Sequence, residues 1–155
     1  MATLRWTICE DNVNDCDKYG DSSLIIAVSD GRIEIVKLLI EKGANLNHSK
    51  RNGETSLLIA CDNDNRVLVK LLLESGANIN QCDRYGDTPL TKAVTNGNID
   101  MTRLLLDEGA DINHSNKYGN TPLISASSND NSEILDLLLS RGADLNVAAN
   151  KVQIM

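Results

Sequence analysis

The stretch Gly109-Ala110-Asp111-Ile112-Asn113 decides the fold, because it returns along the chain at a constant step. The same order of Gly, Ala, Asn or Asp, Leu or Ile, and Asn occurs four times, each 33 positions after the one before. The other occurrences begin at Gly43, Gly76 and Gly142. Self-similarity at a fixed period is the signature of a protein built from stacked supersecondary repeats. The sequence therefore predicts four such repeats.

Two more sets of positions keep this step and describe the start of each repeat. One is a turn glycine and the other is a leucine: Gly20, Gly53, Gly86 and Gly119, and Leu24, Leu57, Leu90 and Leu123. A Thr or Ser before Pro or Ser is a helix N-cap followed by a residue suited to the first helical turn. We therefore expect a first helix over residues 23–29 of repeat 1 and a second over residues 34–42.

Residues that tolerate a left-handed backbone separate the two helices of each repeat. Gly31 and Gly97 occupy this place in repeats 1 and 3, and Asp64 and Asp130 occupy it in repeats 2 and 4. Glycine adopts this conformation freely, and Asp and Asn tolerate it best among the other residues. The alternation, with the matching pairs His48-Ser49 and His114-Ser115, suggests duplication of a block of two repeats.

The second helix of repeat 1 carries Ile35, Val36, Leu38, Leu39 and Ile40, so it is apolar on every side. A helix of this kind is expected to lie buried between neighbours. The chain contains no Phe, so its core must consist of aliphatic side chains. Each such side chain contributes roughly 1.5–3 kcal/mol on full burial, which one isolated repeat cannot obtain.

These features resemble the ankyrin repeat. The closest matches to its pattern are Thr88-Pro89-Leu90 with Ala93 and Thr121-Pro122-Leu123 with Ala126, while Ser22-Ser23-Leu24 and Thr55-Ser56-Leu57 are looser versions. The family's usual His after the Leu is replaced by Ile25, Leu58, Thr91 and Ile124. The resemblance covers residues 14–149. It implies an all-α solenoid, an ankyrin stack of helix-turn-helix repeats joined by short β-hairpin-like loops.

The predicted domain runs over residues 15–149, with repeats at 15–47, 48–80, 81–113 and 114–146. Residues 1–14 are interpreted as a partial N-terminal repeat in which Trp6 caps the stack, and residues 150–155 as a tail. Because both ends depart from the repeat pattern, an alternative reading makes the chain one segment of a longer protein.

Charge and composition limit the class of partner. The formal net charge is -7, which opposes binding to phosphate backbones or anionic membranes and predicts neither a nucleic-acid nor a membrane partner. The first ten residues lack the apolar run of a signal peptide. Four cysteines without CxxC spacing are read as reduced thiols, so we expect the cytoplasm, with the nucleus as the alternative compartment.

The sequence also lacks the constellations that catalysis needs. His48 and His114 lie two repeats apart, roughly 20 Å in a stack, so they cannot share a proton or a metal. We therefore predict a monomeric protein that is not an enzyme and that holds no cofactor or metal.

The resemblance implies that a partner protein is held by the turn tips and the concave side formed by the first helices. The matching positions are Lys18, Tyr19, Arg51, Asn52, Arg84, Tyr85, Lys117 and Tyr118 at the tips, and Asp30, Asn63, Asn96 and Asn129 on the concave side. Arg and Tyr are the residue types that most often carry binding energy. In an alternative interpretation the tips have no binding role, because Asp21, Glu54 and Asp87 neutralise the tip cations.

A protein-binding scaffold or adaptor is thus the predicted function, and the recognition arm of a larger enzyme or effector is the alternative. In some ankyrin proteins the Asn that ends the repeated stretch is hydroxylated. The candidate positions for that modification are Asn47, Asn80, Asn113 and Asn146. A simpler reading gives each of these amides a role in tying its loop together.

Overall fold

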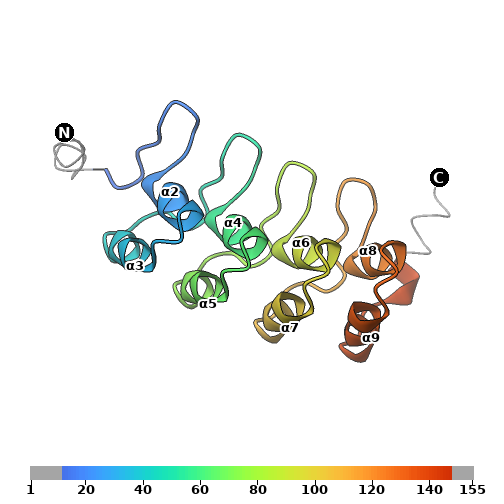
Figure 1. The fold of residues 1–155 in the computed structure, drawn as a ribbon. Coiled ribbons are helices and arrows are strands. Elements are labelled where there is room, and N and C mark those ends of the chain that lie inside the picture. Colours follow the sequence, from blue (N-terminus) through green and yellow to red (C-terminus); the bar gives the residue numbers. More distant parts are fainter. Residues whose placement is uncertain (1–11, 148–155) are drawn as a thin grey trace. The chain divides into compact units, whose positions relative to one another are not determined.

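The computed structural model describes residues 12–147, and Figure 1 shows pairs of short antiparallel helices, each preceded by a projecting loop. The chain divides into two compact units, Met1–Ala77 (unit 1) and Asn78–Met155 (unit 2). Unit 1 contains α2 (Ser23–Ser29), α3 (Ile33–Glu41), α4 (Ser56–Asp62) and α5 (Arg66–Glu74), and unit 2 contains α6 (Pro89–Thr95), α7 (Ile99–Asp107), α8 (Pro122–Ser128) and α9 (Ser132–Ser140).

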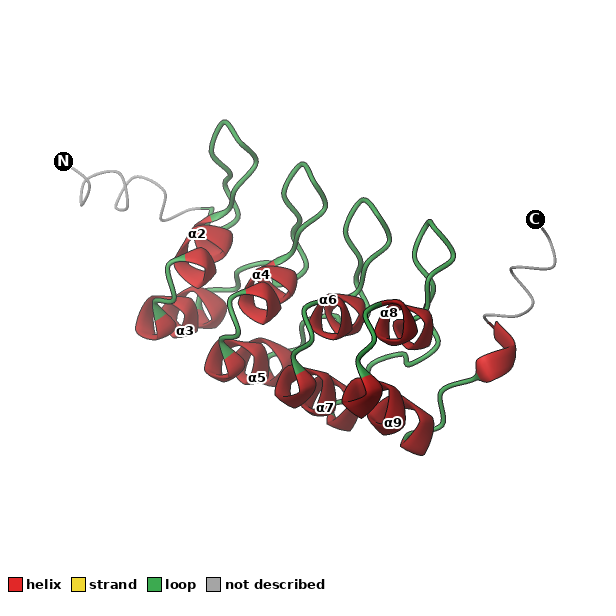
Figure 2. Ribbon diagram, turned by 45° about the vertical axis from the view of Figure 1, so that its right-hand side comes forward, coloured by secondary structure: helices red, strands yellow, loops and turns green. Residues whose placement is uncertain are grey.

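Helices and loops account for residues 12–147, so the predicted all-α repeat architecture is confirmed (Figure 2). The only β-pairing in this range consists of two isolated bridges in unit 1, Cys16 with Ser22 and Ser49 with Thr55. The partial repeat and Trp6 cap predicted for residues 1–14 lie almost wholly outside the described residues. The tail predicted for residues 150–155 lies entirely outside them.

Each first helix begins at the predicted capping residue. The hydroxyls of Ser22 and Thr55 accept from the backbone N–H three residues on, both at 3.3 Å, and Thr88 and Thr121 do the same in unit 2. Such a bond satisfies one of the amides that a helix start leaves unpaired. The first helix of repeat 1 was predicted correctly, whereas its second helix begins and ends one residue earlier than predicted.

An asparagine caps the second helix in three of the four repeats, a feature that the sequence analysis missed. Asn65, Asn98 and Asn131 each accept from the N–H three residues on, at 3.0–3.1 Å. Arg32 holds this place in repeat 1 and makes no side-chain cap. Its backbone angles, φ -87° and ψ 83°, almost equal those of Asn65, φ -90° and ψ 81°.

The left-handed positions are confirmed. Gly31 and Gly97 have φ of 69° and 70°, and Asp64 and Asp130 have φ of 50° and 54°. The turn between the helices therefore keeps one backbone shape whether a glycine or an aspartate occupies it.

Aliphatic side chains form the core of each unit. In unit 1, α2 packs on α3 and α4, and α5 packs on α4 and α3; in unit 2, α6, α7, α8 and α9 repeat this arrangement. Leu68 and Leu72 of unit 1 and Met101, Leu105 and Leu138 of unit 2 are fully buried. Neighbouring repeats within a unit thus bury each other's apolar faces.

The all-round burial predicted for the second helix of repeat 1 is wrong. Ile35 and Leu38 are 38% and 52% exposed, while Val36 and Leu39 are buried. In the described residues α3 packs on α2 and α5, and these two neighbours do not cover Ile35 and Leu38.

Three of the four positions where the family usually has histidine are buried, and Ile124 is half-buried. Ile25 and Leu58 are buried with 1% and 0% exposure, and Thr91 places its hydroxyl 3.1 Å from that of Thr88. Apolar burial thus takes the place of a polar contact at two of these positions.

The missing cap leads to a stability prediction. Arg32→Asn should raise the free energy of unfolding by about 0.5–1 kcal/mol, because the backbone already has the capping geometry that Asn98 uses after Gly97. The lost contact between Arg32 and Asp30 is exposed and 3.7 Å long, so it contributes little. Urea denaturation is the measurement, with Asn98→Ala as the control expected to destabilise by about 1 kcal/mol. An Arg32→Asn protein no more stable than the parent would contradict this view of the cap.

Candidate surface at the hairpin tips

Each first helix is preceded by a hairpin that carries the predicted tip residues. We call residues 16–22, 49–55, 82–88 and 115–121 hairpins 1 to 4. Each is closed by a pair of backbone bonds, as in hairpin 3, where Gly86 N–H and Asp83 N–H donate to Asp83 and Asp87 carbonyls at 3.0 and 3.1 Å. The last turn residue is a glycine with positive φ in every hairpin, as predicted for Gly20.

The first turn residue uses its side chain inside the hairpin. Asp83 Oδ1 accepts from the N–H groups of Tyr85 and Asp87, at 2.8 and 3.1 Å. Asp17 and Asn116 make the same two bonds in hairpins 1 and 4. Hairpin 2 has Lys50 here, and Asn52 replaces the missing acceptor by binding Glu54 N–H through Oδ1 and Glu54 Oε2 through Nδ2. The predicted tip residue Asn52 therefore has both amide atoms engaged within its own turn.

The four tip cations have no carboxylate within ion-pair distance among residues 12–147. Lys18, Arg51, Arg84 and Lys117 are all exposed. The carboxylates expected to neutralise them have other partners: Asp21 lies 3.7 Å from Lys50, Glu54 binds Asn52, and Asp87 binds Asn116. The self-neutralising interpretation of the tips is therefore wrong.

In unit 1, side chains connect hairpins 1 and 2. Arg51 donates to the Lys18 carbonyl and His48 Nε2 to the Gly20 carbonyl, both at 2.9 Å. Lys50 and Asp21 are too far apart for a hydrogen bond at 3.7 Å, and Asp21 Oδ1 is buried without one. Lys18 lies 4.9 Å from the ring centre of Tyr19, which is 61% exposed.

In unit 2, hairpins 3 and 4 are joined more tightly. Lys117 N–H donates to the Tyr85 carbonyl at 2.9 Å, a link between the two backbones. His114 Nε2 donates to the Gly86 carbonyl at 2.9 Å, and Asn116 Nδ2 donates to Asp87 Oδ1 at 2.8 Å. A Cβ atom at Gly86 would lie 3.0 Å from Lys117 N, so this approach requires glycine.

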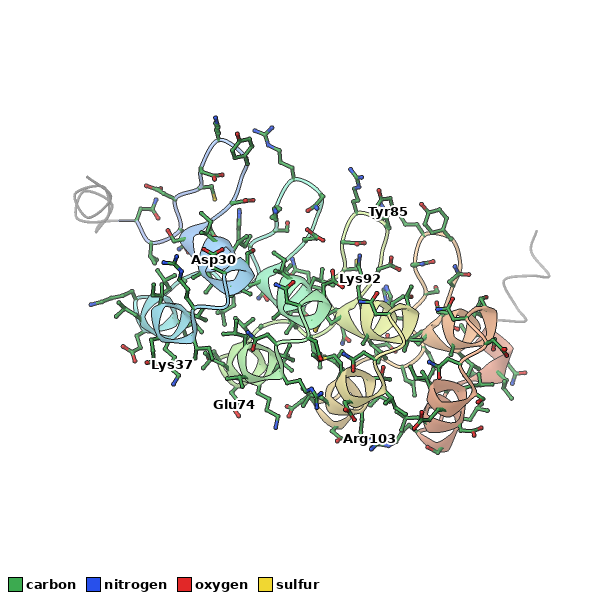
Figure 3. The ribbon with its side chains drawn as sticks, viewed as in Figure 1. Asp30, Lys37, Glu74, Tyr85, Lys92 and Arg103 are labelled. Atoms are coloured by element: carbon green, nitrogen blue, oxygen red, sulfur yellow. The ribbon has the colours of Figure 1, made fainter. Side chains whose placement is uncertain are left out.

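The close hairpins bring aromatic and cationic side chains together in unit 2. The rings of Tyr85 and Tyr118 are stacked, with centroids 6.5 Å apart and an interplanar angle of 24°. The guanidinium of Arg84 lies 4.7 Å from the ring centre of Tyr85 and donates to its hydroxyl. We call Arg84, Tyr85, Lys117 and Tyr118 the tip cluster. Figure 3 labels Tyr85 on the hairpin side of unit 2 and Arg103 on the opposite side.

An ion pair connects hairpin 3 to the first helix of the same repeat, α6. Lys92 of α6 lies 3.2 Å from Asp83 Oδ2, and the Asp83 side chain is only 3% exposed. Because the other carboxylate oxygen holds two turn amides, Asp83 fixes the backbone beside Arg84 and Tyr85 to the first helix. A buried pair of this kind depends on both partners.

The residues predicted on the concave side lie at the other end of the first helices. Asp30, Asn63, Asn96 and Asn129 are the C-cap residues of α2, α4, α6 and α8, and all four are exposed. Asp30 lies 3.7 Å from Arg32, and Asn129 donates to the Thr95 carbonyl at 3.2 Å. A seven-residue helix is about 10 Å long, so tips and C-caps form two separate groups within each repeat.

The Asn that ends the repeated stretch links successive repeats inside a unit. Asn14, which lies 33 positions before Asn47, makes a bond of this kind in unit 1, where its Oδ1 accepts from Asn45 N–H at 2.6 Å. In unit 2, Asn80 and Asn113 accept from Asp111 and Asp144 N–H, both at 2.8 Å. These amides tie one loop to the next rather than closing their own loop. Hydroxylation at Asn47, Asn80, Asn113 and Asn146 stays a prediction.

Among the described residues, no three His, Cys, Asp or Glu side chains lie close enough to hold a metal ion. Cys16 Sγ lies 3.3 Å from His48 Nε2, a contact that the sequence analysis missed. The same nitrogen lies 2.9 Å from the Gly20 carbonyl, which only accepts, so it carries the hydrogen. It cannot then take a proton from the thiol, as the base of a nucleophilic pair must.

The structure also uses several residues that the sequence analysis did not assign. His48, His114, Asn116 and Lys92 all position the hairpins. The two histidines could have been found, because they occupy one repeat position and recur after two repeats.

Paired helices with projecting hairpins, repeated at a fixed step, define a helical repeat protein. A family model described as ankyrin repeats (3 copies) matches residues 2–83 and 68–149. The chain therefore belongs to the ankyrin repeat family, whose repeats generally mediate protein–protein interaction. No curated protein matched the chain. None of the helices in residues 12–147 is long and apolar enough to cross a lipid bilayer.

The close approach of hairpins 3 and 4 can be tested at Gly86. Gly86→Ala and Gly109→Ala both place an alanine at positive φ, +81° and +91°, which costs roughly 1–2 kcal/mol each. Only the first also forces a Cβ against Lys117 N, since nothing lies within 4 Å at Gly109. In urea denaturation Gly86→Ala should therefore be about 1 kcal/mol less stable than Gly109→Ala. Equal losses would show that the hairpins do not depend on this contact.

The buried thiol of Cys61 gives a second test. Desolvation by burial, followed by the charges of Asp62 and Asp64, raises the pKa of Cys61 from 9.0 to about 12. At about pH 8, iodoacetamide should modify the exposed Cys16 and Cys82 and spare Cys61 until urea unfolds the chain.

The raised pKa of Cys61 also predicts how the free energy of unfolding depends on pH. Above pH 9.0 the unfolded thiol ionises while the folded one keeps its proton, so stability falls as pH rises towards 12. The slope is at most about 1.4 kcal/mol per pH unit. Cys61→Ala should lack this contribution, and identical alkaline slopes for both proteins would refute it.

Proposed function

We propose that this chain is a non-catalytic scaffold or adaptor that holds a partner protein on its hairpin tips, with the C-cap residues of the first helices adding polar contacts. The observation that carries this proposal is that, in a chain of net charge -7, all four tip cations are exposed and have no carboxylate partner within residues 12–147. Charges left without a local partner are available to another molecule.

The accompanying residue types support the same function. Tyr19, Tyr85 and Tyr118 are all the tyrosines of the chain, and they are 61%, 40% and 69% exposed. Tyr and Arg are enriched where interfaces gain most of their energy, because they bury a large area and still form polar contacts. Such residues on a rigidly bonded hairpin also lose little freedom when they bind.

The C-cap residues would extend this surface. Asp30, Asn63, Asn96 and Asn129 offer exposed polar side chains at the far end of each first helix.

We also propose the cytoplasm as the setting, because the cysteines at positions 16, 61 and 82 are free thiols, as a reducing compartment would keep them.

The test uses a partner recovered by affinity purification and then measured in isolation. Arg84→Ala combined with Tyr85→Ala should weaken its binding by about tenfold or more, as loss of central contacts does. Arg103→Ala is the matched control, since Arg103 is an exposed cation of the same unit that lies away from the hairpins (Figure 3). Affinity should be measured by isothermal titration and folding by circular dichroism. Unchanged affinity together with an unchanged melting curve would rule out the tip surface.

A further inference from the structure

We infer that the tip cluster of unit 2 recognises an acidic segment of polypeptide in extended conformation, with carboxylates at alternate positions. This inference rests on the proposed function and names the chemistry of the partner. It is carried by the charge, the spacing and the rigidity of Arg84, Tyr85, Lys117 and Tyr118.

The charge argument starts from the acids of hairpins 3 and 4. Asp83 is buried and paired with Lys92, and Asp87 is bonded to Asn116. Hairpin 4, residues 115–121, has no carboxylate at all. Asp87 is half-buried, so the exposed charged residues of the two tips are Arg84 and Lys117, both positive. An acidic segment would be repelled by most of a chain with net charge -7 and drawn to this place.

The spacing argument comes from the two rings. Tyr85 and Tyr118 occupy equivalent places on successive hairpins, and their centroids are 6.5 Å apart. In an extended chain, side chains two residues apart lie on one face and are separated by about 6.6–6.8 Å. A segment crossing both tips would thus present alternate side chains to successive hairpins. Arg84 and Lys117, each next to one of the tyrosines, would meet carboxylates at such alternate positions.

Rigidity favours this binding mode. The Arg84 guanidinium is held over the Tyr85 ring and by its hydroxyl, which leaves other N–H groups of the planar fork for a carboxylate. The bond from Lys117 N–H to the Tyr85 carbonyl fixes the two tips against each other. The parts of the two tyrosines that stay exposed, 40% of Tyr85 and 69% of Tyr118, offer apolar surface to the intervening parts of the segment.

Unit 1 lacks this arrangement and serves as an internal comparison. Hairpin 2 carries Asn52 where hairpin 4 carries Tyr118, so unit 1 has one tip tyrosine and no ring pair. The Arg51 guanidinium is also bonded to the Lys18 carbonyl. A probe selective for the tip cluster should therefore respond to substitutions in unit 2 more than to matching substitutions in unit 1.

The experiment is a 1H–15N NMR titration of the full chain with two short synthetic peptides, one alternating Glu and Thr and the other alternating Gln and Thr. We expect the Glu peptide to bind about tenfold more tightly and to shift the amides of Tyr85, Lys117 and Tyr118. Arg84→Ala with Lys117→Ala should weaken its binding by about tenfold. Lys18→Ala with Arg51→Ala, the matched change in unit 1, should alter its binding less than about twofold.

Equal binding of the Glu and Gln peptides would overturn the acidic specificity, as would equal effects of the two double variants. Tighter binding of a short oligothymidine than of the Glu peptide would overturn it in favour of nucleic acid, since aromatic rings with cations also suit stacked bases. None of these results would decide the proposed function, which is tested with the purified natural partner. Loss of binding to that partner in the Arg84 and Tyr85 variant would sustain the proposed function even if the Glu peptide fails.

Discussion

A repeat of this chain cannot bury its own leucines, and the rest of the structure follows from that constraint. One short helix pair offers two apolar sides, and each fully buried aliphatic side chain contributes roughly 1.5–3 kcal/mol. Within each unit the pairs therefore pack on each other, which leaves Leu72 of unit 1 and Leu105 of unit 2 with 0% exposure. Stability is consequently shared between neighbours rather than held by single repeats.

Because the helices supply the core, the hairpins are free to carry polar chemistry, and in hairpin 3 Asp83 is buried and Asp87 half-buried. The Asp83 carboxylate binds two turn amides and Lys92, so its charge is used within the protein. Its neighbours Arg84 and Tyr85 stay exposed. Local bonding of this acid thereby leaves Arg84 as an exposed cation on an acidic chain.

The two units share one plan but differ where their hairpins meet. His48 and His114 make the same bond to a glycine carbonyl, as a duplicated block of two repeats would. Lys50 of unit 1 corresponds to Asn116 of unit 2, and only the asparagine forms a hydrogen bond to the carboxylate of the preceding hairpin. The shorter link accompanies the direct backbone bond and the stacked tyrosines, which are found in unit 2.

The sequence by itself determined the repeat, its family, its first-helix caps and its left-handed turns, because these depend on residues close together in the chain. It also identified Arg84 and Tyr85 as surface residues, since the 33-residue step places them on turns. Only the tertiary structure decided which acids neutralise which cations, that Asn52 is tied within its turn, and that Tyr85 and Tyr118 stack. Those outcomes depend on distances of a few ångströms between successive repeats, and a periodic pattern records the order of residues without recording how closely their side chains meet.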